Sequence, residues 1–177
     1  KVDGNMSGCP GVPFQQLANF TTGTEDALDW FLSAANPYAA KVDRTPDTRT
    51  VTPGRTGRIA VIGHSLGAAA VSQVQGTDPR IETVVALDKL AGTADTTFGG
   101  SGGTNTPSVP ALAIQSEYGF TVSPYFLAGG GSITPQPGLP DPMRERATGF
   151  DAWAAAGVDS MLVVPRASTH LEYTDIP

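Results

Sequence analysis

At residues 58–75 the chain reads RIAVIGHSLGAAAVSQVQ, an apolar run, a sharp break and then a run of small residues. The first part, 58–63, is short, continuous and apolar, which is typical of a strand buried on both faces. The second part, 66–75, is rich in alanine and is followed by Gly76 and Asp78-Pro79, which predicts a helix that ends there. A buried strand that turns directly into a helix is a building unit of α/β folds.

The rest of the chain repeats this alternation of apolar runs with helical or long polar segments. The predicted strands lie at 58–63, 81–87, 111–115 and 161–164, and the predicted helices at 22–35, 66–75 and 142–156. Strands that are separated by helices or long crossovers pair in parallel. The sequence therefore predicts a single α/β domain over 1–177, with a mostly parallel sheet flanked by helices.

The predicted helix at 22–35 rests on two signals. Thr22 followed three residues later by Glu25 has the spacing of a capping box. Residues 1–20 show neither strand alternation nor a helical period, so we interpret them as a loop. The apolar stripe of the helix consists of Leu28, Phe31, Leu32 and Ala35. We expect Trp30 and Phe31 to lie in the core.

Composition excludes several classes of function. The 177 residues carry 11 Lys and Arg against 17 Asp and Glu, a net charge of −6 without any basic cluster, which argues against a nucleic-acid partner. The longest apolar stretches have about half a dozen residues, far fewer than the roughly 20 that a membrane-spanning helix needs. Cys9 is the only cysteine, so we expect either a passive thiol or a disulfide to a residue outside this chain.

Glycine and proline are abundant, and no metal-binding spacing accompanies them. The 21 glycines and 15 prolines predict long ordered loops, in particular a surface loop at 91–109 and an excursion at 119–141. The glycine run at 99–103 lacks the spacing of a phosphate-binding loop. The two histidines and the carboxylates show no metal-ligand spacing, so we expect neither a metal nor another cofactor.

The segment Gly63-His64-Ser65-Leu66-Gly67 matches the G-x-S-x-G pattern of a nucleophile elbow, with a strand before it and a helix after it. Such a turn holds the serine in a strained conformation, and we expect that only small residues at 63 and 67 allow it. Ser65 then projects from the strand tip beside a helix N-terminus. The backbone N–H of Leu66 is the predicted oxyanion donor.

A serine hydroxyl needs a base, which at neutral pH is usually histidine. His64 adjoins Ser65 and should point away from it, as a packed or hydrogen-bonded residue of the turn. His170 follows the last strand by a short loop, which places it at the same sheet edge as Ser65. The acid that orients the histidine is either Asp88 or Glu117, because each follows a neighbouring strand and either tip lies within reach.

Three segments together resemble the secreted platelet-activating factor acetylhydrolases within the α/β-hydrolases. They are residues 59–69 around the elbow, Ala86-Leu87-Asp88, and Ser116-Glu117-Tyr118, and the resemblance resumes at Ser168-Thr169-His170. It implies an α/β-hydrolase fold and secretion. The resemblance also implies that His170 is the base, and it favours Asp88 over Glu117 as the acid.

This chain departs from the family in two places. The family usually has Phe-Gly-Gly where this chain has Leu66-Gly67-Ala68, and the stretch from 119 to 157 is longer than expected. Similar elbows occur in polyester-degrading and lipase-like bacterial esterases. Phe120, Tyr125 and Phe126 either line an acyl pocket or pack under their own loop.

Part of the expected fold has no counterpart in the sequence. The first credible strand begins only near residue 58, and no segment before Ser65 resembles the loop that supplies the second oxyanion donor in such hydrolases. We therefore expect N-terminal strands to be missing, and the remaining N-terminal part of the same domain to be the partner of this chain.

These observations predict a serine carboxylic-ester hydrolase that works through an acyl-enzyme, with a small lipid-like or short-acyl ester as substrate. The alternatives are a lipase, polyesterase or thioesterase with the same triad, or a non-catalytic hydrolase-like fragment.

Overall fold

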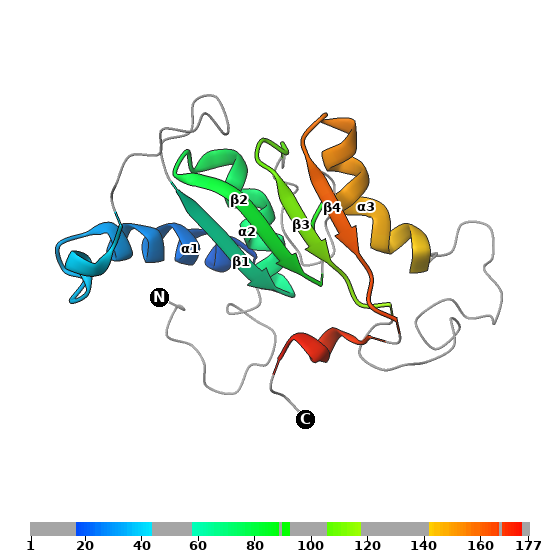
Figure 1. Cartoon of the computed structure of the whole chain (residues 1–177), viewed down its shortest axis with the longest axis horizontal. Coiled ribbons are helices and arrows are strands. Elements are labelled where there is room, and N and C mark those ends of the chain that lie inside the picture. Colours follow the sequence, from blue (N-terminus) through cyan, green and yellow to red (C-terminus); the bar gives the residue numbers. More distant parts are fainter. Residues whose placement is uncertain are drawn as a thin grey trace.

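The computed structural model of the chain describes residues 17–43, 58–88, 90–92, 106–117, 142–166 and 168–174. Four strands form one parallel sheet in the order β1-β2-β3-β4 (Figure 1). They are β1 Ile59–His64, β2 Ile81–Leu87, β3 Ala111–Ile114 and β4 Ser160–Val163. The helices are α1 Leu17–Leu32, α2 Leu66–Thr77 and α3 Pro142–Ala155, and two 3₁₀ turns are η2 Ala39–Lys41 and η4 His170–Tyr173. The predicted α/β arrangement is confirmed at this level.

The strands are aligned so that their C-terminal ends share one edge. Ile62 pairs with Val85, Val85 with Leu112, and Leu112 with Met161. Hydrogen bonds continue this alignment past the strand ends, because the N–H groups of Ser65, Asp88 and Gln115 each donate to the neighbouring strand at 2.9–3.0 Å. Each residue that follows a strand is therefore fixed relative to its neighbours.

All three helices pack on the same face of the sheet. One buried cluster joins inward-facing strand residues such as Val84 and Ala113 to Leu28 of α1, Val71 of α2 and Trp153 of α3. Trp153 is fully buried, and its indole N–H donates to the Val109 carbonyl at 2.9 Å. This cluster is the core that holds the sheet and the helices together.

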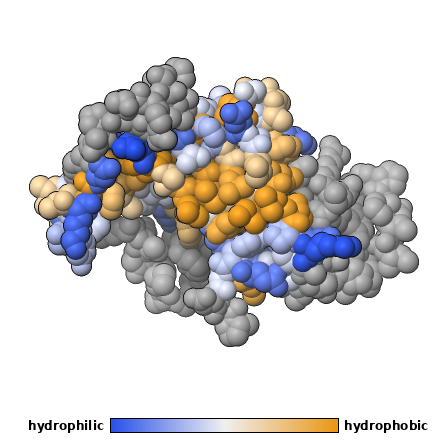
Figure 2. Space-filling model, viewed as in Figure 1, coloured by the Kyte–Doolittle hydropathy of each residue, from blue (hydrophilic) through white to orange (hydrophobic). Residues whose placement is uncertain are grey.

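The opposite face of the sheet is apolar and uncovered in the described part of the chain. Ile62 on β1 is 66% exposed, and Met161 and Val163 on β4 are 62% and 40% exposed. Figure 2 shows a continuous apolar surface over the strands in this view. Parallel sheets are almost always covered on both faces. The described helices therefore complete only half of the usual layering.

Helix α1 corrects three expectations. It begins at Leu17, so residues 17–20 are helical and Thr22 and Glu25 lie inside the helix instead of capping it. The reason is tertiary, because Leu17 is buried with Leu66 and Ala69 of α2. Trp30 and Phe31 are 52% and 43% exposed rather than in the core, since α1 turns Leu28 toward the sheet.

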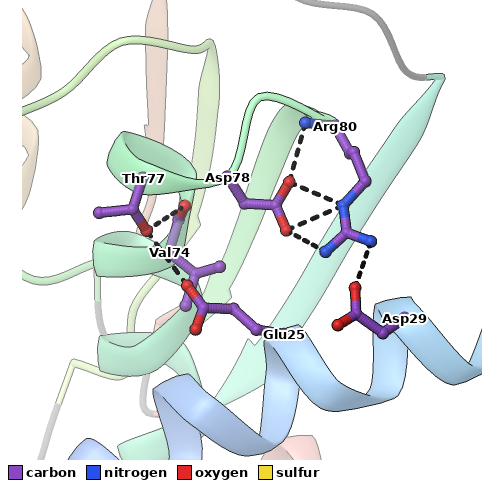
Figure 3. Close-up of polar contacts among 6 residues, drawn as sticks. All are labelled: Glu25, Asp29, Val74, Thr77, Asp78 and Arg80. Carbon is purple, nitrogen blue, oxygen red and sulfur yellow. Dashed lines mark hydrogen bonds and ion pairs between the residues drawn. The ribbon is translucent and has the colours of Figure 1, made fainter.

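An ion-pair network fastens α1 to the turn between α2 and β2 (Figure 3). The Arg80 guanidinium donates to both carboxylate oxygens of Asp78 at 2.5–3.0 Å and to Asp29 of α1 at 2.6 Å. The Asp78 side chain is only 5% exposed. Its hydrogen bonds raise the pKa of Arg80 above the ordinary value. Arg80 therefore holds α1 against this turn.

The surface loop predicted at 91–109 is described only at its two ends, 91–92 and 106–109, and most of these residues are buried or half-buried. Ala91 donates from its backbone N–H to the Ser72 hydroxyl at 3.1 Å. The Ser108 N–H donates to Gln75 at 3.0 Å. Both acceptors are buried side chains of α2. They satisfy backbone groups of the connection and anchor it to the helix.

Other expectations fall outside the described residues. They concern Cys9, the glycine run at 99–103 and the excursion at 119–141. Among the described helices, none is long and apolar enough to cross a membrane.

Candidate active site

The turn that carries Ser65 is strained. Ser65 has φ 57° and ψ −123°, a conformation that non-glycine residues rarely adopt. A Cβ atom at Gly63 would lie 2.2 Å from the carbonyl oxygen of Gly67, so the close approach of strand and helix requires glycine there. A Cβ atom at Gly67 would meet no atom of the described residues within 4 Å. The expectation that both positions must be small is therefore correct at 63 and wrong at 67.

A continuous hydrogen-bond chain joins the three residues predicted for the triad. The Oγ of Ser65 lies 2.9 Å from Nε2 of His170, and Nδ1 of His170 lies 2.5 Å from Oδ2 of Asp88. The side chains of His170 and Asp88 are each 14% exposed. The three groups come from the ends of β1 and β2 and from η4, and the structure brings their side chains together in the hydrogen-bonded order Ser65, His170, Asp88.

The geometry separates the two candidate acids. The Asp88 carboxylate contacts His170, and its second oxygen accepts the Ser116 N–H at 3.2 Å. Asp88 itself has φ 41°, so the chain turns sharply at the end of β2 and directs the side chain toward the histidine. Glu117 contributes through its backbone, whose N–H donates to the Ser168 hydroxyl at 3.1 Å. It therefore helps to hold the segment that carries the histidine.

The segment after β4 runs back across the sheet edge to deliver His170. Ser168 follows β4 in the chain but lies beside the end of β3, where its hydroxyl accepts a hydrogen bond from the Glu117 N–H. The same hydroxyl donates to the Pro165 carbonyl at 2.7 Å. Two residues later His170 has reached Asp88 at the end of β2 and Ser65 at the end of β1. In Figure 1 this turn lies where the arrowheads of the strands point.

Sequence reasoning named Ser116 and Ser168 only within the segments of the family resemblance and did not predict their contacts beside the triad. Ser116 holds Asp88 through its backbone, which leaves no signal in a side chain. Ser168 is 7% exposed and precedes His170 by two residues, a spacing that could have drawn attention to it. Tyr173 ends the same turn, and burial raises the pKa of its hydroxyl.

His64 is hydrogen-bonded, as the sequence suggested, but its partner is part of the site. Its Nε2 lies 2.8 Å from the backbone carbonyl oxygen of His170. The two imidazole rings are also in contact, with centroids 4.6 Å apart. This link was not foreseen.

The structure describes the predicted oxyanion donor but not the residues predicted for an acyl pocket. Leu66 is the first residue of α2, and the first N–H groups of a helix have no partner within it. Its amide therefore lies next to Ser65 at the positive end of the helix dipole. The pocket candidates Phe120, Tyr125 and Phe126 lie outside the described residues. Within the described part, no cluster of His, Cys, Asp or Glu could hold a metal ion.

No family model and no curated protein matches this chain.

Proposed function

We propose that this chain is the catalytic part of a serine carboxylic-ester hydrolase of the α/β-hydrolase fold. One observation supports the proposal above all, the hydrogen-bond chain from Ser65 through His170 to Asp88, with bonds of 2.9 and 2.5 Å. The backbone geometry of Ser65 also supports the proposal, because this residue has a strained φ of 57° and lies between a parallel strand and the N-terminus of a helix.

In this mechanism the Ser65 oxygen attacks the ester carbonyl carbon while His170 Nε2 accepts the hydroxyl proton. The tetrahedral oxyanion forms beside the Leu66 amide. It collapses as the C–O bond to the alcohol breaks, and His170 returns the proton to the leaving oxygen. Water then attacks the acyl-serine with His170 again as base, which releases the acid and restores Ser65. Asp88 keeps the imidazole proton on Nδ1 and stabilises the imidazolium.

The substrate proposed is a lipid-like or short-acyl ester, which follows from the resemblance of the sequence to the platelet-activating factor acetylhydrolases. A lipase, polyesterase or thioesterase would use the same triad and the same steps. Turnover compared across acyl lengths, with oxygen and sulfur esters of one acid, distinguishes these substrates.

We propose further that β1 pairs with an additional strand in the active protein. Among the described strands β1 is an edge, and five of its six residues carry no charged or polar side chain. Natural edges are usually short, charged or covered. The segment that covers β1 would also bring the second oxyanion donor, whose loss costs about 10²–10³ in rate.

Labelling with a fluorophosphonate tests the catalytic proposal without knowledge of the substrate. In the complete, N-terminally extended protein we expect the wild type to be labelled and to hydrolyse p-nitrophenyl esters, and Ser65→Ala and His170→Ala to lose both properties while staying folded. Ser33→Ala, at the end of α1, is the matched control. Wild-type turnover by Ser65→Ala would refute the assignment.

The edge proposal has a separate test. We expect the 177-residue chain alone to aggregate and to hydrolyse esters poorly, and an N-terminally extended protein to be soluble and active. A monodisperse, fully active 177-residue protein would contradict it. An extended protein that folds but is neither labelled nor active would indicate the non-catalytic alternative.

A further inference from the structure

His64 lies directly before Ser65 and reaches the backbone of the residue that activates Ser65. Its Nε2 is 2.8 Å from the carbonyl oxygen of His170. A carbonyl oxygen can only accept a hydrogen bond, so the proton lies on Nε2 of His64 and this nitrogen donates. The ring also lies against the His170 ring, at 4.6 Å between centroids and 36° between planes, and 6.0 Å from the Tyr173 ring.

The base needs such support because of where it sits in the chain. His170 opens η4, a four-residue 3₁₀ turn, and turns of this kind have poorer hydrogen-bond geometry than an α-helix. The turn is reached only after the chain has crossed the ends of two other strands. A misplacement of about 1 Å in a reacting group can reduce the rate about 100-fold.

His64 gives His170 this support from β1, the strand that ends next to Ser65. Asp88 fixes the ring of His170 through Nδ1, whereas His64 fixes the backbone from which that ring projects. Residue 64 ends β1 and residue 65 follows it directly in the turn. The contact from His64 therefore fixes the base relative to the same strand end that carries the nucleophile. The distance between Nε2 of His170 and Oγ of Ser65 then depends on few intervening bonds.

We propose that His64 is a positioning residue for His170, acting through its hydrogen bond to the His170 carbonyl. This inference rests on the proposed function, since it assigns His64 a part in the same site. His64 exchanges no proton with the substrate. Its loss should therefore slow acyl transfer and leave substrate binding nearly unchanged.

Three substitutions separate the hydrogen bond from the ring contact. His64→Gln keeps an N–H donor and loses the ring, His64→Phe keeps a ring and loses the donor, and His64→Ala loses both. With a p-nitrophenyl ester we expect kcat to fall about 10- to 100-fold for Phe and Ala, with KM within about twofold of the wild type. We expect Gln to recover most of kcat. Equal kcat for wild type and Phe, or a change confined to KM, would overturn the proposal.

A measurement without substrate keeps this test independent of the proposed function. In the wild type, the Nδ1 proton of His170 that bonds Asp88 should give a far-downfield ¹H NMR resonance. We expect His64→Phe to broaden or shift this resonance and His64→Gln to restore it. An unchanged resonance in the Phe variant would refute the positioning role even if Ser65 proves catalytic. Should the protein hydrolyse no ester at all, the proposed function fails, and the NMR result still decides the role of His64.

Folding is checked by thermal unfolding of each variant. If His64→Phe does not fold, the comparison of His64→Gln with His64→Ala decides, because both lack the ring and only Gln has the donor. Equal kcat and equal NMR spectra for those two variants would overturn the proposal.

Discussion

Replacing Asp88 by asparagine should disable the base while preserving the fold. Asparagine has the same size, and it tolerates the φ of 41° at this position better than most residues. The Ser116 N–H donates to Oδ1 and needs an acceptor, so the amide oxygen should face Ser116 and the NH₂ group should face His170. A donor there turns Nδ1 into an acceptor and moves the ring proton to Nε2. That nitrogen, 2.9 Å from Ser65 Oγ, then has no lone pair to accept a proton.

The expected magnitude is about 10⁴ in kcat, the loss seen when the triad carboxylate of a serine protease becomes an amide. It corresponds to about 5.5 kcal/mol of transition-state stabilisation at 1.36 kcal/mol per factor of ten. The assay is steady-state hydrolysis of a p-nitrophenyl ester, with KM expected to change little. Glu117→Gln is the matched control and should cost less than about tenfold. If Asp88→Asn kept more than a tenth of wild-type kcat, or Glu117→Gln were the more damaging change, Asp88 would not be the orienting acid.

Two further predictions follow from the packing. Gly63→Ala should abolish fluorophosphonate labelling and destabilise the fold by about 1–3 kcal/mol or more, because its Cβ would lie 2.2 Å from the Gly67 backbone. Gly67→Ala should keep most of the activity. Equal labelling and equal thermal stability of the two variants would contradict this geometry. Arg80→Ala should cost about 2–3 kcal/mol in urea unfolding, because it strands the buried Asp78 carboxylate. Asp29→Ala removes only the exposed half of the network and should cost less than about 1 kcal/mol. A larger loss of unfolding free energy for Asp29→Ala than for Arg80→Ala would refute the role given to the Arg80–Asp78 pair.

The sheet and the edge that carries the candidate site could be predicted from local patterns. Strand β1 and the elbow are encoded within a dozen consecutive residues, where apolar run, turn glycine and helix follow one another directly. Parallel pairing then places the residues after β1, β2 and β4 at one edge. This is why Ser65 and His170, with Asp88 or Glu117 as the acid, could be named as candidates from the sequence before any distance was known.

What could not be predicted depends on contacts between distant segments. The start of α1 is set by the burial of Leu17 against α2, which overrides the capping signal at Thr22. The choice between Asp88 and Glu117 depends on which strand end the returning segment reaches, and only the family resemblance favoured one of them. The partner of His64 lies 106 residues away, so no local pattern announces it.

The segment after β4 supplies His170 to a site whose other two residues lie much earlier in the chain, and this separates the three residues in time during synthesis. Ser65 is separated from His170 by 105 residues, and Asp88 by 82. At a translation rate of about 5–20 residues per second, Ser65 is synthesised about 5–20 seconds before His170. Under the proposed function, the nascent chain carries an unactivated serine hydroxyl throughout that interval. Reactivity toward esters would then begin only after β4 has joined the sheet and the segment that follows it has reached Ser65.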